Sequence, residues 1–270
     1  MMDKSTIETL KTIQKSGYDF EDKDTHALAK AMLDNIGHPD SAIRDELIYP
    51  TLAHLLYDGH FKEEALENYL NTLLDAEHLF YDIKNQSEYG VLMRSFSSLQ
   101  IVVLLDLHRN KHMIDETTIQ NAFHTFLDYF EREEAFKGYD EEVGWIHAIA
   151  HSADVIDQFV QINCLKADQL KRMFEAIHTK FKQKNHVFNF NEDKRMAVAL
   201  MNGIKRNLLS EEFLKSWVDT VASIDKQLPL PKRMCMQNNA RNLLSAFYFA
   251  LVKNQSHPYL RNHIEKVLIH

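Results

Sequence analysis

Three side chains in the middle of the chain, His147, His151 and Asp154, have types and a spacing that can do chemistry. At about 100° per residue on a helix, His151 lies near 40° and Asp154 near 340° from His147, so the three share one stripe. Two histidines four residues apart have the spacing that metalloproteases use for two zinc ligands. A carboxylate one turn later can act as a third ligand or can orient an imidazole. This stripe is therefore the first candidate site.

The same stripe lacks the features that would specify a reaction. Position 148 is alanine, so the HExxH motif of zinc proteases is absent, and Ser152 and Ala153 separate His151 from Asp154, so there is no adjacent His-Asp pair. The chain has no GxSxG turn for a nucleophilic serine and no glycine-rich phosphate loop. The alternative is a hydrogen-bonded histidine face in a groove or packed against the next unit, since structural networks produce the same arrangement of residues. The sequence leaves both interpretations open.

A helix predicted over residues 144–161 would position this stripe, because its aliphatic residues fall on the opposite side. Tyr139 and Trp145 flank the histidines and are candidate ligand-binding residues. At about 160°, Trp145 falls on the apolar side of the predicted helix, which favours packing as its role. Gly138 and Gly144 are expected to mark the turn that leads into the helix.

Polar residues recur near the start of the first helix in each predicted pair. They are Arg44 and Asp45, then Arg94, then the histidine stripe, then Asp193 and Arg195, and finally Asn239 and Arg241. In stacked hairpins the matching helix ends line one edge, so we expect these groups to converge on a groove. Arg94, on an apolar helix, needs an acidic partner, for which Asp45 and Asp154 are the candidates. The cluster at residues 128–134 is interpreted as a solvated helix end, and an internal lattice of salt bridges is the alternative to a groove.

The composition predicts an all-α fold. Seven glycines and five prolines in 270 residues are too few for the tight turns of a strand-rich protein. After N-terminal helices within residues 1–36, helices are expected at 40–57 (kinked at Pro50), 62–76, 88–108, 115–133, 144–161, 166–184, 191–207, 210–226, 232–253 and 256–268. The first helices of the pairs begin 40 to 56 residues apart, a period typical of HEAT or armadillo repeats. We therefore predict one domain, residues 1–270, whose residues 40–268 form a right-handed superhelix of about five hairpins; an irregular bundle is the alternative.

Charge and cysteine content narrow the classes of partner. The net charge of −8 disfavours nucleic acid. The two cysteines, Cys164 and Cys235, lie far apart without CxxC spacing, which indicates reduced, buried thiols in a cytoplasmic protein. The N-terminus has no apolar signal region, and the longest apolar run, Leu99 to Leu107, falls far short of the ~20 residues of a membrane span. We expect no membrane and no cofactor.

Three segments resemble a bacterial family known as domain of unknown function 2785. They are RDELIY at 44–49, RSFSSL at 94–99 and, most specifically, KGYDEEVGWIHAIAHSADVID at 137–157. The segment Glu192 to Arg195 and the later Asn239 fit the same pattern, and the resemblance covers about residues 40–250. Lys137 departs from it, since arginine is expected there; the charge is kept but bidentate pairing is lost. The resemblance implies a helical, HEAT-like fold and a bacterial cytosolic origin, and it implies no activity.

Three functional hypotheses follow from the sequence. The leading one is a helical-repeat scaffold that binds a protein, a peptide or a small molecule in a polar groove. The groove would be lined by Arg44, Asp45, Arg94, Tyr139, Trp145, His147, His151, Asp154, Asp193 and Arg195. The alternative is a metal-assisted hydrolase in which His147 and His151 hold the ion, with Asp154 or Asp45 as third ligand or general base. In the third hypothesis the polar residues are purely structural.

Overall fold

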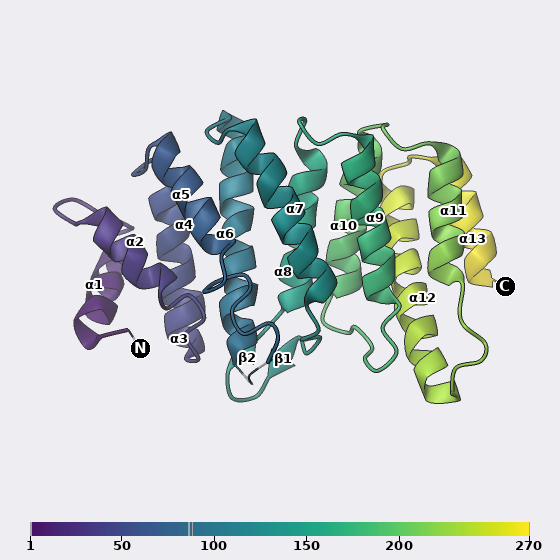
Figure 1. Ribbon diagram of the computed structural model, residues 1–270, viewed down its shortest axis with the longest axis horizontal. Helices are drawn as coiled ribbons and strands as arrows, with labels where there is room; N and C mark the ends of the chain where they lie inside the picture. Colours follow the sequence, from purple (N-terminus) through teal and green to yellow (C-terminus); the bar gives the residue numbers. More distant parts are fainter. Residues whose placement is uncertain (1, 86, 88, 270) are drawn as a thin grey trace. The chain divides into compact units, whose positions relative to one another are not determined.

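The computed structural model describes residues 2–85, 87 and 89–269, and it is all-α apart from one short β-ribbon (Figure 1). The chain divides into two compact units, Met1–Val155 and Ile156–His270, which are described separately. The all-α prediction is confirmed. The prediction of a single domain stays a prediction.

The first unit contains the N-terminal elements and most of the candidate site. Its elements are α1 (Lys4–Lys15), α2 (Thr25–Leu33), α3 (Ser41–Ile43), the π-helical turn η1 (Arg44–Ile48), α4 (Tyr49–Tyr57), α5 (Glu63–Leu73), α6 (Gly90–Lys111), α7 (Glu116–Arg132), β1 (Tyr139–Asp140) and β2 (Gly144–Trp145). The next helix, α8 (Ala148–Gln161), begins in this unit and ends in the second one. Asp40 and Asp115 cap α3 and α7 through their carboxylates. At α1 the cap is Asp3, whose side chain accepts from Thr6 N–H.

The second unit contains the remaining helices, which are α9 (Ala167–Phe181), α10 (Glu192–Lys205), α11 (Glu211–Ala222), α12 (Leu230–Lys253) and α13 (Pro258–Ile269). Ser210 caps α11, since its side chain accepts from Phe213 N–H. In each unit a helix packs on the next helix or the next but one, for example α4 on α6 and α11 on α13. This sequential packing agrees with the predicted order of the helices. Both cysteines are free thiols and are half-buried, less buried than expected.

The predicted kink at Pro50 takes the form of a π-helical turn followed by a new helix. Pro50 has no N–H, so it cannot donate to the carbonyl of Glu46 one turn earlier. The side-chain amide of Gln14 donates to that carbonyl instead, at 2.8 Å. Just before the proline, Tyr49 N–H donates to Arg44 O, five residues back, which is the π-helical bond. The turn places Arg44 and Asp45 outside regular α-helical geometry.

Helix α6 forms the centre of the first unit. Fifteen of its residues are buried, among them Arg94, Ser95 and Gln100. Its length and composition would also allow it to cross a membrane, and 78% of that apolar window is buried inside the protein, as in a core helix.

A glycine in the turn after α2 allows two backbones to approach closely. A Cβ at Gly37 would overlap backbone atoms of Met93 on α6, and the backbone cannot rotate away as a side chain can. We expect Gly37→Ala to lower the free energy of unfolding by about 1–3 kcal/mol or more, measured by urea denaturation. Gly59→Ala is the control: its φ of +80° is strained for alanine, but no atom lies within 4 Å. A smaller loss at Gly37 than at Gly59 would contradict the close approach.

Candidate binding site

Arg44 lies at the centre of the candidate site, with no exposed surface. Its Nε donates to Asp45 Oδ1 at 2.8 Å, and its Nη1 donates to the carbonyl of His38 at 2.9 Å. Its Nη2 donates to the carbonyl of Val143 at 2.8 Å, and its guanidinium lies 4.7 Å from the ring centre of Phe96. The side chain therefore ties η1 and the preceding turn to the residue before β2 and to α6.

Burial acts on both members of the Arg44–Asp45 pair. It lowers the pKa of Arg44 from its ordinary value, against the opposing effect of Asp45. It raises the pKa of Asp45, against the opposing effect of the guanidinium. Asp45 is half-buried and its side chain is 30% exposed. The backbone carbonyls around Arg44 thus provide much of its solvation, and Arg44 acts as an internal clamp rather than as a surface ligand-binding cation.

The segment 139–147, which we call the aromatic ribbon, is where the sequence prediction was partly wrong. Tyr139 and Asp140 pair antiparallel with Trp145 and Gly144, so α8 begins at Ala148 rather than at 144. His147 precedes the helix with a φ of 52°. A helical wheel that continues back through His147 therefore misplaces Trp145. This residue is 45% exposed and is not packed in the core.

Three aromatic rings of the ribbon contact one another on its exposed side. The indole of Trp145 stacks on the imidazole of His147, with ring centres 4.5 Å apart and planes 5° apart. Tyr139, itself 39% exposed, meets Trp145 edge-on at 4.9 Å. Exposed aromatic groups of this size are uncommon on a surface that binds nothing.

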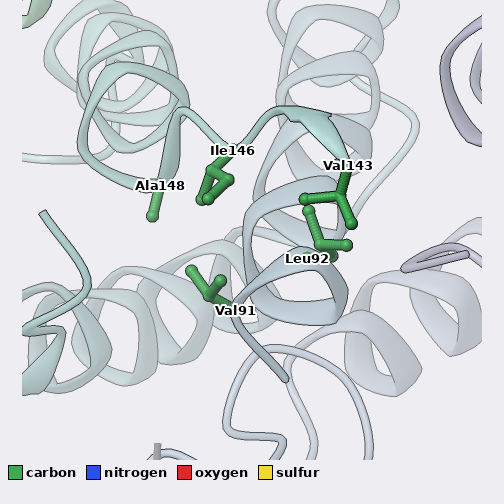
Figure 2. Packing of buried hydrophobic residues seen from close by; sticks show 5 residues of the cluster. All are labelled: Val91, Leu92, Val143, Ile146 and Ala148. Atoms are coloured by element: carbon green, nitrogen blue, oxygen red, sulfur yellow. The ribbon is translucent and has the colours of Figure 1, made fainter. Parts of the chain in front are cut away.

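The backbone of the ribbon is held from several directions. The carbonyl of Gly138 accepts from both Ile146 N–H and His147 N–H. Val143, Ile146 and Ala148 pack on Val91 and Leu92 at the start of α6, and Figure 2 shows these side chains pointing toward one another. Gly144, at a φ of +78°, is the residue whose left-handed backbone allows the turn. The exposed rings therefore sit on a fixed base.

His151 and Ser95 form a buried pair beneath the ribbon. The single hydroxyl hydrogen of Ser95 goes to the carbonyl of Ile146. His151 Nδ1, 2.9 Å from Ser95 Oγ, must then be the donor in that contact. A histidine that activates a serine accepts its proton, and here the proton points elsewhere. The pair therefore fastens α8 to α6 and does not make Ser95 a nucleophile.

Arg94 has a different partner from the two that the sequence indicated. It makes a bidentate pair with Glu133, through Nε at 2.6 Å and Nη2 at 2.9 Å, and both side chains have no exposed surface. Glu133 also accepts from Tyr129 OH and Ala135 N–H, and Arg94 Nη1 donates to the carbonyl of Tyr81. Burial lowers the pKa of Arg94, but its bonds to Glu133 outweigh this and raise it overall.

This pairing overturns, for Glu133 alone, the interpretation of residues 128–134 as a solvated helix end, since the other charged residues of the segment are exposed. Glu133 is the residue directly after α7, and its backbone turns to the extended region (ψ 122°), which directs the chain away from the helix axis. The usable signal in the sequence was Tyr129, one turn earlier, since a buried tyrosine needs an acceptor for its hydroxyl.

The structure therefore sorts the ten predicted site residues into groups. Arg44, Asp45, Trp145, His147 and His151 are brought together around Phe96 and the ribbon, and Tyr139 completes its exposed side. Arg94 belongs to the buried pair with Glu133. Asp154 lies on α8 three residues after His151 and is half-buried. Asp193 and Arg195 are half-buried on α10, in the second unit.

In the second unit, Asn239 has a structural role that the sequence did not specify. Its Oδ1 accepts from Phe188 N–H at 2.9 Å, and its Nδ2 donates to the carbonyl of His186 at 2.9 Å. The fully buried amide thus holds the connector between α9 and α10. Glu192, at the start of α10, accepts from Phe190 N–H in the same connector, and burial raises its pKa.

A metal site needs a third ligand beside the two histidines. Among residues 2–85, 87 and 89–269, no group of three or more histidine, cysteine, aspartate or glutamate side chains is arranged to hold a metal ion. His147 and His151 have ring centres 5.6 Å apart, and Nδ1 of His151 is used by Ser95. The hydrolase alternative therefore has no observation in its favour in this part of the chain.

Comparison with known proteins identifies the family. No curated protein and no solved structure matches the chain. Residues 79–249, more than half of the chain, match the family described as protein of unknown function (DUF2785). That range includes α6 with Arg94, the aromatic ribbon and the connector held by Asn239. The chain belongs to the DUF2785 family.

Proposed function

We propose that this protein is a helical scaffold that binds a basic segment of another protein on the aromatic ribbon. The observation that carries the proposal is the pre-positioned group of Tyr139, Trp145 and His147, in which Tyr139 and Trp145 are exposed and the half-buried His147 stacks beneath the indole. Aromatic side chains dominate the energetics of protein interfaces because they bury large areas at low entropic cost. A fixed backbone beneath them reduces the cost of ordering on binding.

The charge around the ribbon supports a basic ligand. Asp140 ends the first strand, and Glu141 and Glu142 lie in the turn that follows it. Asp140 is paired with Lys137 and Glu142 with the hydroxyl of Tyr89, and Glu141 is exposed. An arginine or lysine side chain placed on the indole face would gain a cation–π contact and lie close to these carboxylates. The buried clamp residues Arg44 and Arg94 would support the site without touching the ligand.

The scaffold itself is proposed to be a stack of hairpins. Within each unit a helix packs on its neighbours one and two places along the chain, as consecutive hairpins in HEAT repeats do. This pattern supports, for each unit, the right-handed superhelical arrangement predicted from the spacing of the helices.

A peptide-binding experiment tests the proposed function. A short, labelled peptide of alternating arginine and glycine is titrated with the full chain, and its anisotropy is recorded. We expect Trp145→Leu, which keeps apolar area but removes the π-face, to weaken binding by about three- to tenfold. Trp145→Phe should retain part of the affinity. Phe249→Ala, which removes an aromatic side chain that is 67% exposed on α12, is the matched control and should change nothing.

The same titration has a further readout. A matched peptide of alternating aspartate and glycine should not bind. Equal affinity for the Trp145→Leu variant and the unchanged protein would rule out the ribbon as the binding surface, even if the acidic protein still attracts the peptide.

A further inference from the structure

The two units carry opposite net charges, which the total of −8 conceals. Met1–Val155 contains 29 acidic and 13 basic residues, a net charge of −16, whereas Ile156–His270 contains 10 acidic and 18 basic residues, a net charge of +8. Charges of opposite sign attract different partners and steer their encounter with the protein. A basic ligand suits the first unit, and the second unit selects an acidic one.

Helix α12 concentrates this positive charge. Its 24 residues include Lys232, Arg233, Arg241 and Lys253 and no aspartate or glutamate. It packs on α10 and α13 through its buried side (Figure 1). At about 100° per residue, Leu230, Met234 and Arg241 fall within about 40° of one another, so they share a face. Leu230 is 57% exposed and Met234 is 50% exposed, so that face is turned to solvent.

A groove adjoins the exposed face. It has a volume of about 410 Å³ and is lined by Gln237, Asn238 and Arg241 of α12, by Ala222 and Ile224 at the end of α11, and by Val267 and Leu268 of α13, among others. Within the part of the chain that the structure describes, the side chains of Gln237, Asn238 and Arg241 make no hydrogen bond or ion pair. An unpaired guanidinium beside two amides offers bidentate donors for a carboxylate and partners for a peptide backbone.

We propose that this face of α12, consisting of Leu230, Met234, Gln237, Asn238 and Arg241, docks an acidic segment with apolar side chains from another protein. A carboxylate of the segment would pair with Arg241, and its apolar side chains would cover Leu230 and the adaptable Met234. Nucleic acid fits less well. A phosphate backbone gains its affinity from several lysine and arginine contacts, and it makes no favourable contact with exposed leucine and methionine. The site is separate from the aromatic ribbon and does not depend on it.

The test is a binding titration on the full chain. The probe is a labelled peptide of alternating glutamate and leucine, with two matched probes: one with lysine in place of glutamate, and one with serine in place of leucine. We expect the first probe to bind and both matched probes to bind at least about tenfold more weakly. Arg241→Glu and Met234→Ser should each weaken binding of the first probe by a similar factor. Lys184→Glu, an exposed charge reversal in the same unit, is the matched control and should leave the affinity within about twofold.

Several results would overturn the proposal. Equal loss for Lys184→Glu and Arg241→Glu would show a non-specific charge effect. Competition by a short DNA duplex as effective as the unlabelled peptide would assign the face to nucleic acid. Light scattering that shows a dimer of this chain, lost in Arg241→Glu, would assign it to a second copy. Because Arg241 and Met234 are exposed, both variants should keep the unfolding free energy of the unchanged protein, so lost binding would not reflect lost folding.

Discussion

Glu133→Gln is expected to lower the free energy of unfolding by about 3–5 kcal/mol, measured by urea denaturation. The substitution keeps the shape of the side chain but removes its charge, so the guanidinium of Arg94 remains buried without a counter-ion. Removing one partner of a buried ion pair costs far more than the pair itself contributes, because the remaining charge cannot be solvated. We expect the helical content near neutral pH to be retained, with a lower midpoint of unfolding.

An exposed ion pair at the end of the same helix provides the control. Asp128 and Arg132 are 2.9 Å apart, with side chains 57% and 42% exposed, so Asp128→Asn should cost less than about 1 kcal/mol. The double variant Arg94→Met with Glu133→Leu removes both charges and should recover a substantial part of the loss. If Glu133→Gln and Asp128→Asn lowered the free energy of unfolding by the same small amount, the buried charge of Arg94 would not depend on Glu133 as its counter-ion.

Arg44→Lys is expected to lower the free energy of unfolding by about 2–4 kcal/mol, and to release the aromatic ribbon. A lysine ammonium is compact and cannot reach Asp45, the carbonyl of His38 and the carbonyl of Val143 at once, as the planar guanidinium does. These acceptors would stay buried without a donor. The variant keeps the positive charge of residue 44 and loses the planar geometry of the guanidinium, so it distinguishes the effects of the two on stability.

Two measurements follow the two effects of this change. Urea denaturation gives the stability, with Arg132→Lys as the matched, exposed control expected to stay within about 0.5 kcal/mol. Tryptophan emission gives the state of the ribbon, once Trp217→Phe has removed the other tryptophan from both proteins. In that background Arg44→Lys should shift the emission of Trp145 and speed proteolysis within residues 138–147. Unchanged emission and proteolysis, with stability lost, would mean that Arg44 supports η1 and does not hold the ribbon.

The two proposed binding surfaces can be tested independently of each other. Trp145→Leu should affect the arginine peptide alone, and Arg241→Glu should affect the glutamate–leucine peptide alone. If both proposals hold, the chain can carry a basic and an acidic segment at the same time. Such an arrangement would make the opposite charges of its two units a means of selecting partners.

The sequence by itself determined the helices and most of their ends. Few glycines and prolines, apolar periodicity and caps such as Asp40 and Ser210 act over one or two turns, so they can be recognised locally. The family was also visible in the sequence, and the three segments that carry the resemblance contain the histidines, Arg44 and Arg94. Their burial and their neighbours could not be obtained in this way.

The tertiary structure alone decided which residues contact one another and which are exposed. Glu133 was assigned to solvent because a cluster of charged residues normally lies on a surface, whereas the turn after α7 brings it to Arg94, 39 residues earlier in the sequence. Trp145 was assigned to the core because the apolar pattern continues through it, whereas pairing of β1 with β2 interrupts the helix and turns the indole outward. The burial of Glu133 and the exposure of Trp145 depend on which distant groups supply their hydrogen bonds or pair with their segment. Periodicity within one segment does not contain this information.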